Sequence, residues 1–156
     1  MTEAVSGHLC RKMKMEMSAF RFLAEEDVAL LQDHLRCHRL AAGEVLWREG
    51  DPSDFLCFIL AGRIHMKKQT EFPGKEVIVG IHGKGSIIGA ASFLDRSPRP
   101  LSARTLEETS ILTLDRDNFD DIVKNHPKLA LNLFQGMIHS LSSRLKQAFE
   151  RLASIF

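Results

Sequence analysis

The chain has 156 residues, 44% of them hydrophobic, which suits one domain with a substantial core. Its 21 Lys and Arg residues nearly balance its 20 Asp and Glu residues, which excludes a general attraction to nucleic acid or anionic lipid. The cysteines, Cys10, Cys37 and Cys57, show no CxxC spacing and indicate reduced thiols rather than a disulfide framework. No apolar run is long enough to span a bilayer, and the N-terminus lacks a signal peptide's apolar stretch. We therefore expect a cytoplasmic protein with no membrane partner.

Residues 1–42 are predicted to form an N-terminal helical segment. The pattern is helical from about Cys10 to Leu40, and Val28, Leu31 and Leu35 fall on one face. Acidic residues at positions 25–27 suit the positive end of a helix dipole. We expect this helix to precede the rest of a single domain.

Residues 43–114 change to short β-like runs separated by clusters of Gly, Pro and Asp. Many short strands at even spacing, without long helices between them, indicate a small barrel or jelly roll. The fold is therefore predicted to be mainly β with flanking helices. The expected strands are Val45–Trp47, Phe55–Leu60, Ile64–Lys68, Lys75–Ile81, Leu101–Thr105 and Ser110–Leu114.

Residues 115–156 are predicted to be helical. Asp115 can cap a short helix, and Pro127 is tolerated in the first turn of the next one. In that second helix, apolar residues recur at alternating steps of four and three, which is typical of a coiled-coil seam. We expect a homodimer through this helix, although a helix packed on its own barrel gives a similar pattern. The expected interface residues are Phe134, Ile138, Leu141, Leu145, Ala148 and Leu152.

The turn at residues 85–102 is the candidate pocket. A glycine followed by small, helix-tolerant residues can direct free backbone N–H groups at an anion. Arg99 lies between two prolines, so its guanidinium loses little entropy when it binds a phosphate. The alternative is a structural arginine paired with a carboxylate such as Asp95. The expected ligand-binding residues are Gly89, Ala90, Ala91, Ser92, Arg99 and Ser102.

Other site types have weaker support. His34 and His38 have the i, i+4 spacing of metal ligands on a helix with Cys37 between them, but no third ligand is close in the sequence. A solvated helix face explains them better, and we expect no metal. A cupin enzyme would need a His-x-His pair, which the chain lacks, so His65 and His82 are interpreted as surface or filler residues. No nucleophile and base pattern indicates catalysis, and we expect no enzyme activity.

Several landmarks together resemble the cyclic nucleotide-binding domain family, including the sensor domains of catabolite activator-type regulators. These landmarks are 42-AGEVL-46, 48-REGDPSD-54, 59-ILAGRI-64, 85-GSIIG-89 and 97-SPR-99. The resemblance covers nearly the whole chain. It implies a β jelly roll, also called a double-stranded β-helix, followed by a long C-terminal helix. It also implies a cyclic nucleotide ligand, cAMP or cGMP, with its phosphate on Arg99.

The family's phosphate-binding turn differs from this chain at two positions. The family's glutamate, which accepts a hydrogen bond from the ribose 2′-hydroxyl, aligns with Ala90. The residue whose backbone N–H helps to hold the phosphate aligns with Pro100, which has no N–H. The resemblance therefore implies an anion site at Gly89–Arg99 that lacks two of the usual contacts.

The leading hypothesis is a non-catalytic sensor that binds a small anionic effector and relays binding through the C-terminal helix. A degenerate domain that acts as a dimeric interaction scaffold is the second. The chain ends at Phe156, where relatives begin a helix-turn-helix domain, so we expect no direct nucleic-acid binding by this chain. A free-standing sensor and a sensor fragment of a transcription regulator both remain open.

Overall fold

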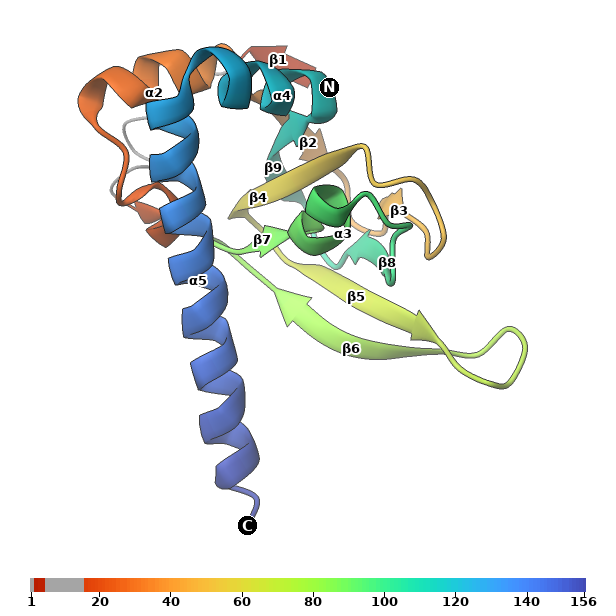
Figure 1. Ribbon diagram of the computed structural model, residues 1–156. Coiled ribbons are helices and arrows are strands. Elements are labelled where there is room, and N and C mark those ends of the chain that lie inside the picture. The colour runs from red at the N-terminus through yellow and green to blue at the C-terminus, as the bar shows by residue number, and fades with distance from the viewer. Residues whose placement is uncertain (1, 5–15) are drawn as a thin grey trace.

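Two antiparallel sheets form the β core of the computed structural model, which describes residues 2–4 and 16–156. The first sheet contains, in spatial order, β1 (Thr2–Ala4), β2 (Arg36–Leu40), β9 (Thr109–Asp115), β4 (Phe55–Ala61) and β7 (Ile87–Ile88). The second contains β3 (Val45–Trp47), β8 (Ser102–Thr105), β5 (Ile64–Gln69) and β6 (Glu76–His82). This arrangement, followed by a long C-terminal helix, confirms the predicted mainly β jelly-roll fold (Figure 1).

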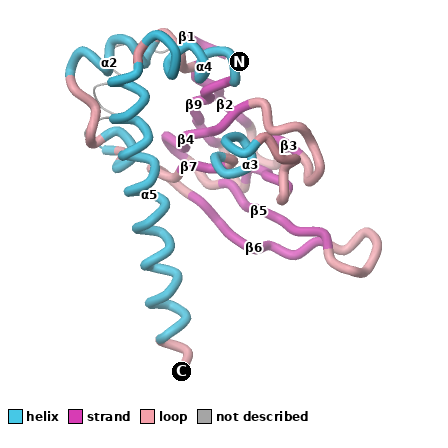
Figure 2. Tube along the Cα trace, in the orientation of Figure 1, coloured by secondary structure: helices cyan, strands magenta, loops and turns pink. Residues whose placement is uncertain are grey.

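The helical elements gather on one side of the strands, except for one short helix that lies among them (Figure 2). They are the 3-10 helix η1 (Ser18–Phe20), α2 (Glu25–Gln32), α4 (Arg116–Asn125) and α5 (Pro127–Ala153). The exception is α3 (Ala90–Asp95), which contacts β4. The C-terminal half of α5 projects beyond the rest of the molecule (Figure 1).

The prediction of a helix from Cys10 to Leu40 is wrong for its last part. Arg36–Leu40 is a strand, β2, which pairs antiparallel with β9 and places Cys37 opposite Leu112. The segment has no β-branched residue, so its own sequence gives little preference for a strand. We therefore attribute its extended conformation to pairing with β9. The earlier part, from Cys10 to residue 15, lies outside the described residues. Val28 and Leu31 lie on α2, Leu35 follows the end of that helix, and all three are buried.

The core has two parts. One lies between the helices and the first sheet, where Phe20 and Phe58 stack with ring centroids 4.8 Å apart. The other lies between the sheets and includes Ile59, Ile64 and Trp47. The indole N–H of Trp47 donates to the carbonyl of Leu101 at 2.9 Å, which fixes the ring at the edge of this second core.

Helices α4 and α5 begin as the sequence predicts. The carboxylate of Asp115 accepts a hydrogen bond from the backbone N–H of Asn118 at 2.8 Å, and Pro127 occupies the first turn of α5. The first half of α5 packs tightly on η1. A Cβ atom on Gly136 would lie 1.7 Å from the backbone oxygen of Ala19. Only glycine therefore permits this approach of the two backbones.

The predicted seam on α5 is exposed over most of its length. The face that packs on the chain is a different one, which includes Leu129, Leu133 and Met137. Phe134, the first seam residue, is the exception, because its ring lies 5.6 Å from that of Phe119. The large seam residues beyond it are exposed, namely Ile138, Leu141, Leu145 and Leu152. Within the described part of the chain, no helix has the length and apolar character needed to cross a membrane.

Candidate ligand-binding site

A cavity of about 220 Å³ lies beside α3, between strand β7 and helix α5. Apolar side chains form most of its wall, and two arginines reach it from different parts of the chain. The lining residues include Trp47, Met66, Ile87, Ile88, Gly89, Ala90, Ala91, Ser92, Arg99, Leu101, Leu141 and Arg144. Two cations on a mostly apolar wall suit a small anion with an apolar part.

Most of the predicted ligand-binding residues meet at this cavity. Gly89, Ala90, Ala91, Ser92 and Arg99 all line it. Ser102 does not line the cavity. Its hydroxyl instead accepts a hydrogen bond from the backbone N–H of Glu49 at 2.8 Å. The structure therefore brings the turn and its arginine together and assigns Ser102 a contact with the neighbouring loop.

Arg99 is a buried cation, with only 1% of its surface exposed. Its Nη1 donates to the carbonyl of Gly89 at 3.0 Å, and its Nη2 donates to the carbonyl of Phe55. The guanidinium carbon lies 3.9 Å from the ring centroid of Trp47. Within residues 2–4 and 16–156, its Nε has no hydrogen-bond partner and the guanidinium forms no ion pair with a carboxylate. Burial lowers the pKa of Arg99, which indicates that its charge is poorly compensated.

Asp95, the partner that a structural role for Arg99 would suggest, is engaged elsewhere. Its carboxylate accepts hydrogen bonds from the backbone N–H of Ser97 at 2.9 Å and from the Ser97 hydroxyl. These bonds lower the pKa of Asp95 and keep it charged. The alternative of a structural Asp95–Arg99 pair is therefore not formed.

Gly89 is required by the packing around Arg99. Its φ of +76° lies in the left-handed region that side chains rarely adopt. A Cβ atom there would lie 2.4 Å from Nη1 of Arg99 and 3.0 Å from the Trp47 ring. The glycine thus allows the chain to turn into α3 and leaves room for the arginine.

The start of α3 supplies backbone donors at the cavity. The N–H of Phe93 closes the first helical hydrogen bond on the carbonyl of Gly89 at 3.2 Å. The N–H groups of Ala90, Ala91 and Ser92 precede it in the first turn, where a helix provides no internal acceptors. All three residues line the cavity.

Sequence reasoning missed the contribution of α5 to this site. Nη1 of Arg144 donates to the carbonyl of Ile87 at 2.6 Å, and its Nη2 donates to Nδ1 of His82 at 2.9 Å. Burial, and then the charge of Arg144, lower the pKa of His82 to about 4, so the ring is neutral at pH 7. No local pattern could reveal a pair separated by 62 positions. The interpretation of His82 as a surface or filler residue is wrong.

The other histidines agree with expectation only in part, since His65 is a buried filler residue while His34 and His38 do not share a helix face. His65 is buried in β5, and neither of its ring nitrogens has a hydrogen-bond partner within the described ranges. His38 lies on strand β2, where its Nε2 is 2.9 Å from the hydroxyl of Thr113. His34 follows α2 and instead contacts Asp121 of α4 at 2.6 Å. The i, i+4 pair on a helix face is therefore not formed.

Comparison with known proteins identifies the family. The family model of the cyclic nucleotide-binding domain matches residues 37–126. The chain belongs to this family. This confirms the resemblance inferred from the glycine and arginine landmarks, since the matched region contains all of them.

Relatives of the chain differ greatly in length. Patatin-like phospholipase domain-containing protein 6 of Pongo abelii is 31% identical over 74% of this chain, which spans 8% of that protein. A CRP-like cAMP-activated global transcriptional regulator of Mycobacterium tuberculosis is 25% identical over 87% of this chain, which spans 58% of it. The crystal structure of a cyclic nucleotide-binding domain from Methylobacillus flagellatus covers 100% of this chain and 89% of its own, with 23% identity and a TM-score of 0.85. The chain thus spans less than two thirds of each curated relative named here.

Proposed function

We propose that this chain is a non-catalytic regulatory module that binds a small anionic effector of the cyclic nucleotide class at the Gly89–Arg99 turn. The observation that carries the proposal is the environment of Arg99. Its buried cation has only carbonyl and hydroxyl oxygens as hydrogen-bond acceptors, and its Nε faces no partner in the described part of the chain. A buried charge without a counter-ion is unfavourable, and a phosphate would supply the missing negative charge.

The rest of the cavity suits the same ligand class. First-turn N–H groups of α3 provide further donors, while Met66 and Ile88 provide apolar contact for a base. Ala90 and Pro100 remove two contacts that the family usually makes, worth roughly tenfold to a thousandfold in affinity. We therefore expect binding of cAMP or cGMP that is weaker than a complete site would give. The Mycobacterium tuberculosis relative is named as cAMP-activated, which supports this choice of ligand.

The relay to α5 follows from the size of the cavity. Its volume of about 220 Å³ is below the roughly 300–1,000 Å³ of most ligand sites. Leu141 and Arg144 of α5 form part of its wall. We expect a nucleotide to displace this wall, which would make ligand binding and helix position one coupled equilibrium.

The exposed seam of α5 supports a homodimer. In that dimer, a shift of α5 on ligand binding would reach the partner helix. Ile138, Leu145 and Leu152 are 64%, 55% and 56% exposed on one stripe. A second copy of the helix would bury this stripe. The paired substitution Leu145→Glu and Leu152→Glu should yield monomers in sedimentation velocity. Gln147→Glu, which adds one charge outside the stripe, should leave the dimer intact. A wild-type chain that sediments as a monomer contradicts the dimer.

The ligand proposal is tested by isothermal titration of ligand-stripped protein with cAMP and with cGMP. We expect saturable binding that is lost in Arg99→Met, which keeps the aliphatic contact with Trp47 but removes the charge. Arg104→Ala, at an exposed arginine on neighbouring β8, is the matched control and should bind as wild type. Ala91→Glu places a negative charge at an exposed position on the cavity wall, so it tests anion binding without altering the core.

Trp47 offers an independent readout, because it is the only tryptophan and stacks on Arg99. Ligand binding at Arg99 should change its fluorescence in the wild-type and Arg104→Ala proteins alike. No heat and no fluorescence change up to about 1 mM of either nucleotide would contradict the proposal.

A dimeric interaction scaffold is the second candidate function. Ala90, Pro100 and the hydrogen bonds of Arg99 to the Gly89 and Phe55 carbonyls favour it, because they are compatible with a pocket that has lost its ligand. This candidate predicts the same dimer but no nucleotide binding. Arg99→Met would then leave partner binding unchanged.

A further inference from the structure

Three potential metal ligands converge near the N-terminal end of α5, outside the cavity described above. His34 follows the end of α2, Asp121 lies on α4, and His126 joins α4 to α5. One donor atom from each lies within 4.8 Å of the other two. The sequence separates the first from the others by more than eighty positions, so only the fold brings them together.

The spacing of these donors is close to that of a tetrahedral site. Nε2 of His34 lies 2.6 Å from Oδ2 of Asp121, and the rings of His34 and His126 are 5.6 Å apart at 77°. Ligand atoms about 2.0–2.2 Å from zinc lie roughly 3.4 Å from one another. Side-chain displacements of about 1 Å would bring the donors to this spacing, with the His34–Asp121 hydrogen bond replaced by two bonds to the metal.

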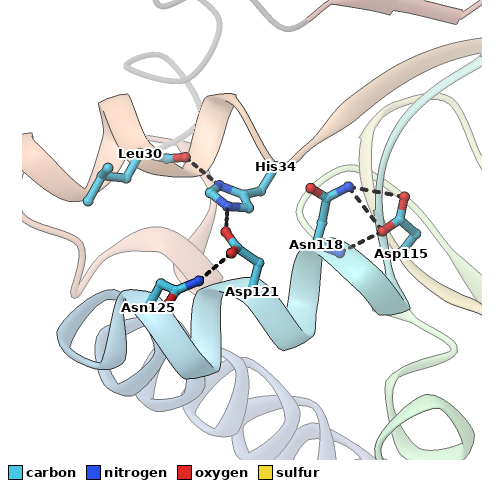
Figure 3. Close-up of polar contacts among 6 residues, drawn as sticks. All are labelled: Leu30, His34, Asp115, Asn118, Asp121 and Asn125. Atoms are coloured by element: carbon cyan, nitrogen blue, oxygen red, sulfur yellow. Dashed lines mark hydrogen bonds and ion pairs between the residues drawn. The ribbon is translucent and has the colours of Figure 1, made fainter.

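Hydrogen bonds from outside the cluster already orient His34 and Asp121 (Figure 3). Nδ1 of His34 is bonded to the carbonyl of Leu30 at 2.7 Å, which directs Nε2 toward Asp121. The second carboxylate oxygen of Asp121 accepts a hydrogen bond from the side-chain amide of Asn125 at 2.6 Å. Metal-binding histidines and carboxylates are typically held by such outer contacts, because these fix the ring orientation and the free lone pair.

We propose that His34, Asp121 and His126 bind a zinc ion, with water in the fourth position. Two imidazoles and one carboxylate form a donor set that suits this metal. The His34 side chain is 11% exposed and that of Asp121 is 44% exposed, so the site is held by the fold yet open to an incoming ion. The bound ion would clamp the end of α2 to the junction of α4 and α5. This proposal is independent of nucleotide binding.

The test is isothermal titration of the full chain with zinc chloride after treatment with a chelator. We expect one zinc ion per chain, and at least a tenfold weaker affinity in His126→Ala and in Asp121→Asn. Both positions are partly exposed, so both variants should fold, which circular dichroism checks. His139→Ala is the matched control, since it removes a histidine of α5 that lies outside the cluster, where its ring is hydrogen-bonded to Arg21 and lies edge-on to Phe22.

The cysteines require a second measurement, because thiolates bind zinc strongly. Cobalt in place of zinc should give the visible spectrum of nitrogen and oxygen ligands, with no thiolate charge-transfer band. Zinc should also raise the melting temperature of the wild type but not of His126→Ala. The proposal is overturned by no saturable binding below about 100 μM, by unchanged affinity in both variants, or by a thiolate band. In those cases His34 and Asp121 form a hydrogen-bonded pair only.

Discussion

Replacing Gly89 by alanine should destabilise the domain more than the same change at Gly74. Both glycines have nearly the same left-handed φ, +76° and +77°, so the backbone strain of an alanine is similar at each, about 1–2 kcal/mol. The surroundings differ. Nothing lies within 4 Å of a Cβ at Gly74, whereas one at Gly89 would meet Arg99 at 2.4 Å and Trp47 at 3.0 Å.

The collision at Gly89 adds a separate cost. Nη1 is the end of a flexible side chain, but here the guanidinium is buried, stacked on Trp47 and bonded to the carbonyl of Phe55. Displacing it should therefore cost a further ~1–3 kcal/mol, as overpacking of a filled core does. We expect Gly89→Ala to lose about 2–5 kcal/mol of unfolding free energy and Gly74→Ala about 1–2 kcal/mol.

Urea denaturation of the two variants, followed by circular dichroism and by Trp47 fluorescence, measures both losses. Native-state fluorescence should also change in Gly89→Ala, because the arginine moves on the indole face, and should stay unchanged in Gly74→Ala. Equal losses of unfolding free energy in the two variants would show that the Arg99 side chain moves aside without a measurable cost. The inference that Gly89 and Arg99 form one packed unit would then be refuted.

Three further changes test other parts of the structure by urea denaturation. Gly136→Ala should lower the unfolding free energy by about 2 kcal/mol, because the clash with the Ala19 backbone costs more than the ~1 kcal/mol gained in helix propensity. A variant more stable than the wild type would disprove this packing. The low pKa of His82, about 4, means that the unfolded state binds more protons between about pH 6.5 and 4, so stability should fall as the pH is lowered through this window. With allowance for solvent screening, the loss from about pH 7.5 to 5 should be ~1 kcal/mol, and His82→Gln should remove it. Asp115→Ala should cost ~1 kcal/mol through loss of the cap on α4.

The sequence predicts best what depends on local signals. Turn residues mark β3 to β6, β8 and β9, and Asp115 and Pro127 mark the helix starts. Strand β2 was missed because its conformation comes from pairing with β9, and β7 because it has only two residues.

The candidate site also contains a part that local sequence predicts and a part that only the fold brings together. The turn around Gly89 and the identity of Arg99 depend on residues close together in the chain, so they could be predicted. Arg144 and His82 could not, because their contact exists only once α5 lies against β6 and β7. The cluster of His34, Asp121 and His126 was missed for the same reason, although His34 had been considered with the wrong partner.

Leu141 connects the two halves of the proposed function. It lines the cavity and is also 40% exposed on the seam of α5, so one side chain belongs to both the ligand site and the surface offered to a second copy. A partner helix packed on the seam would restrict the movement of this wall, and a ligand that moves the wall would alter the seam. Thermodynamic linkage then requires that the ligand change the dimerisation constant by the same factor by which dimerisation changes ligand affinity. Arg144 also lines the cavity and donates a hydrogen bond to the carbonyl of Ile87. This bond would resist the same movement, so breaking it would be part of the free-energy cost of binding.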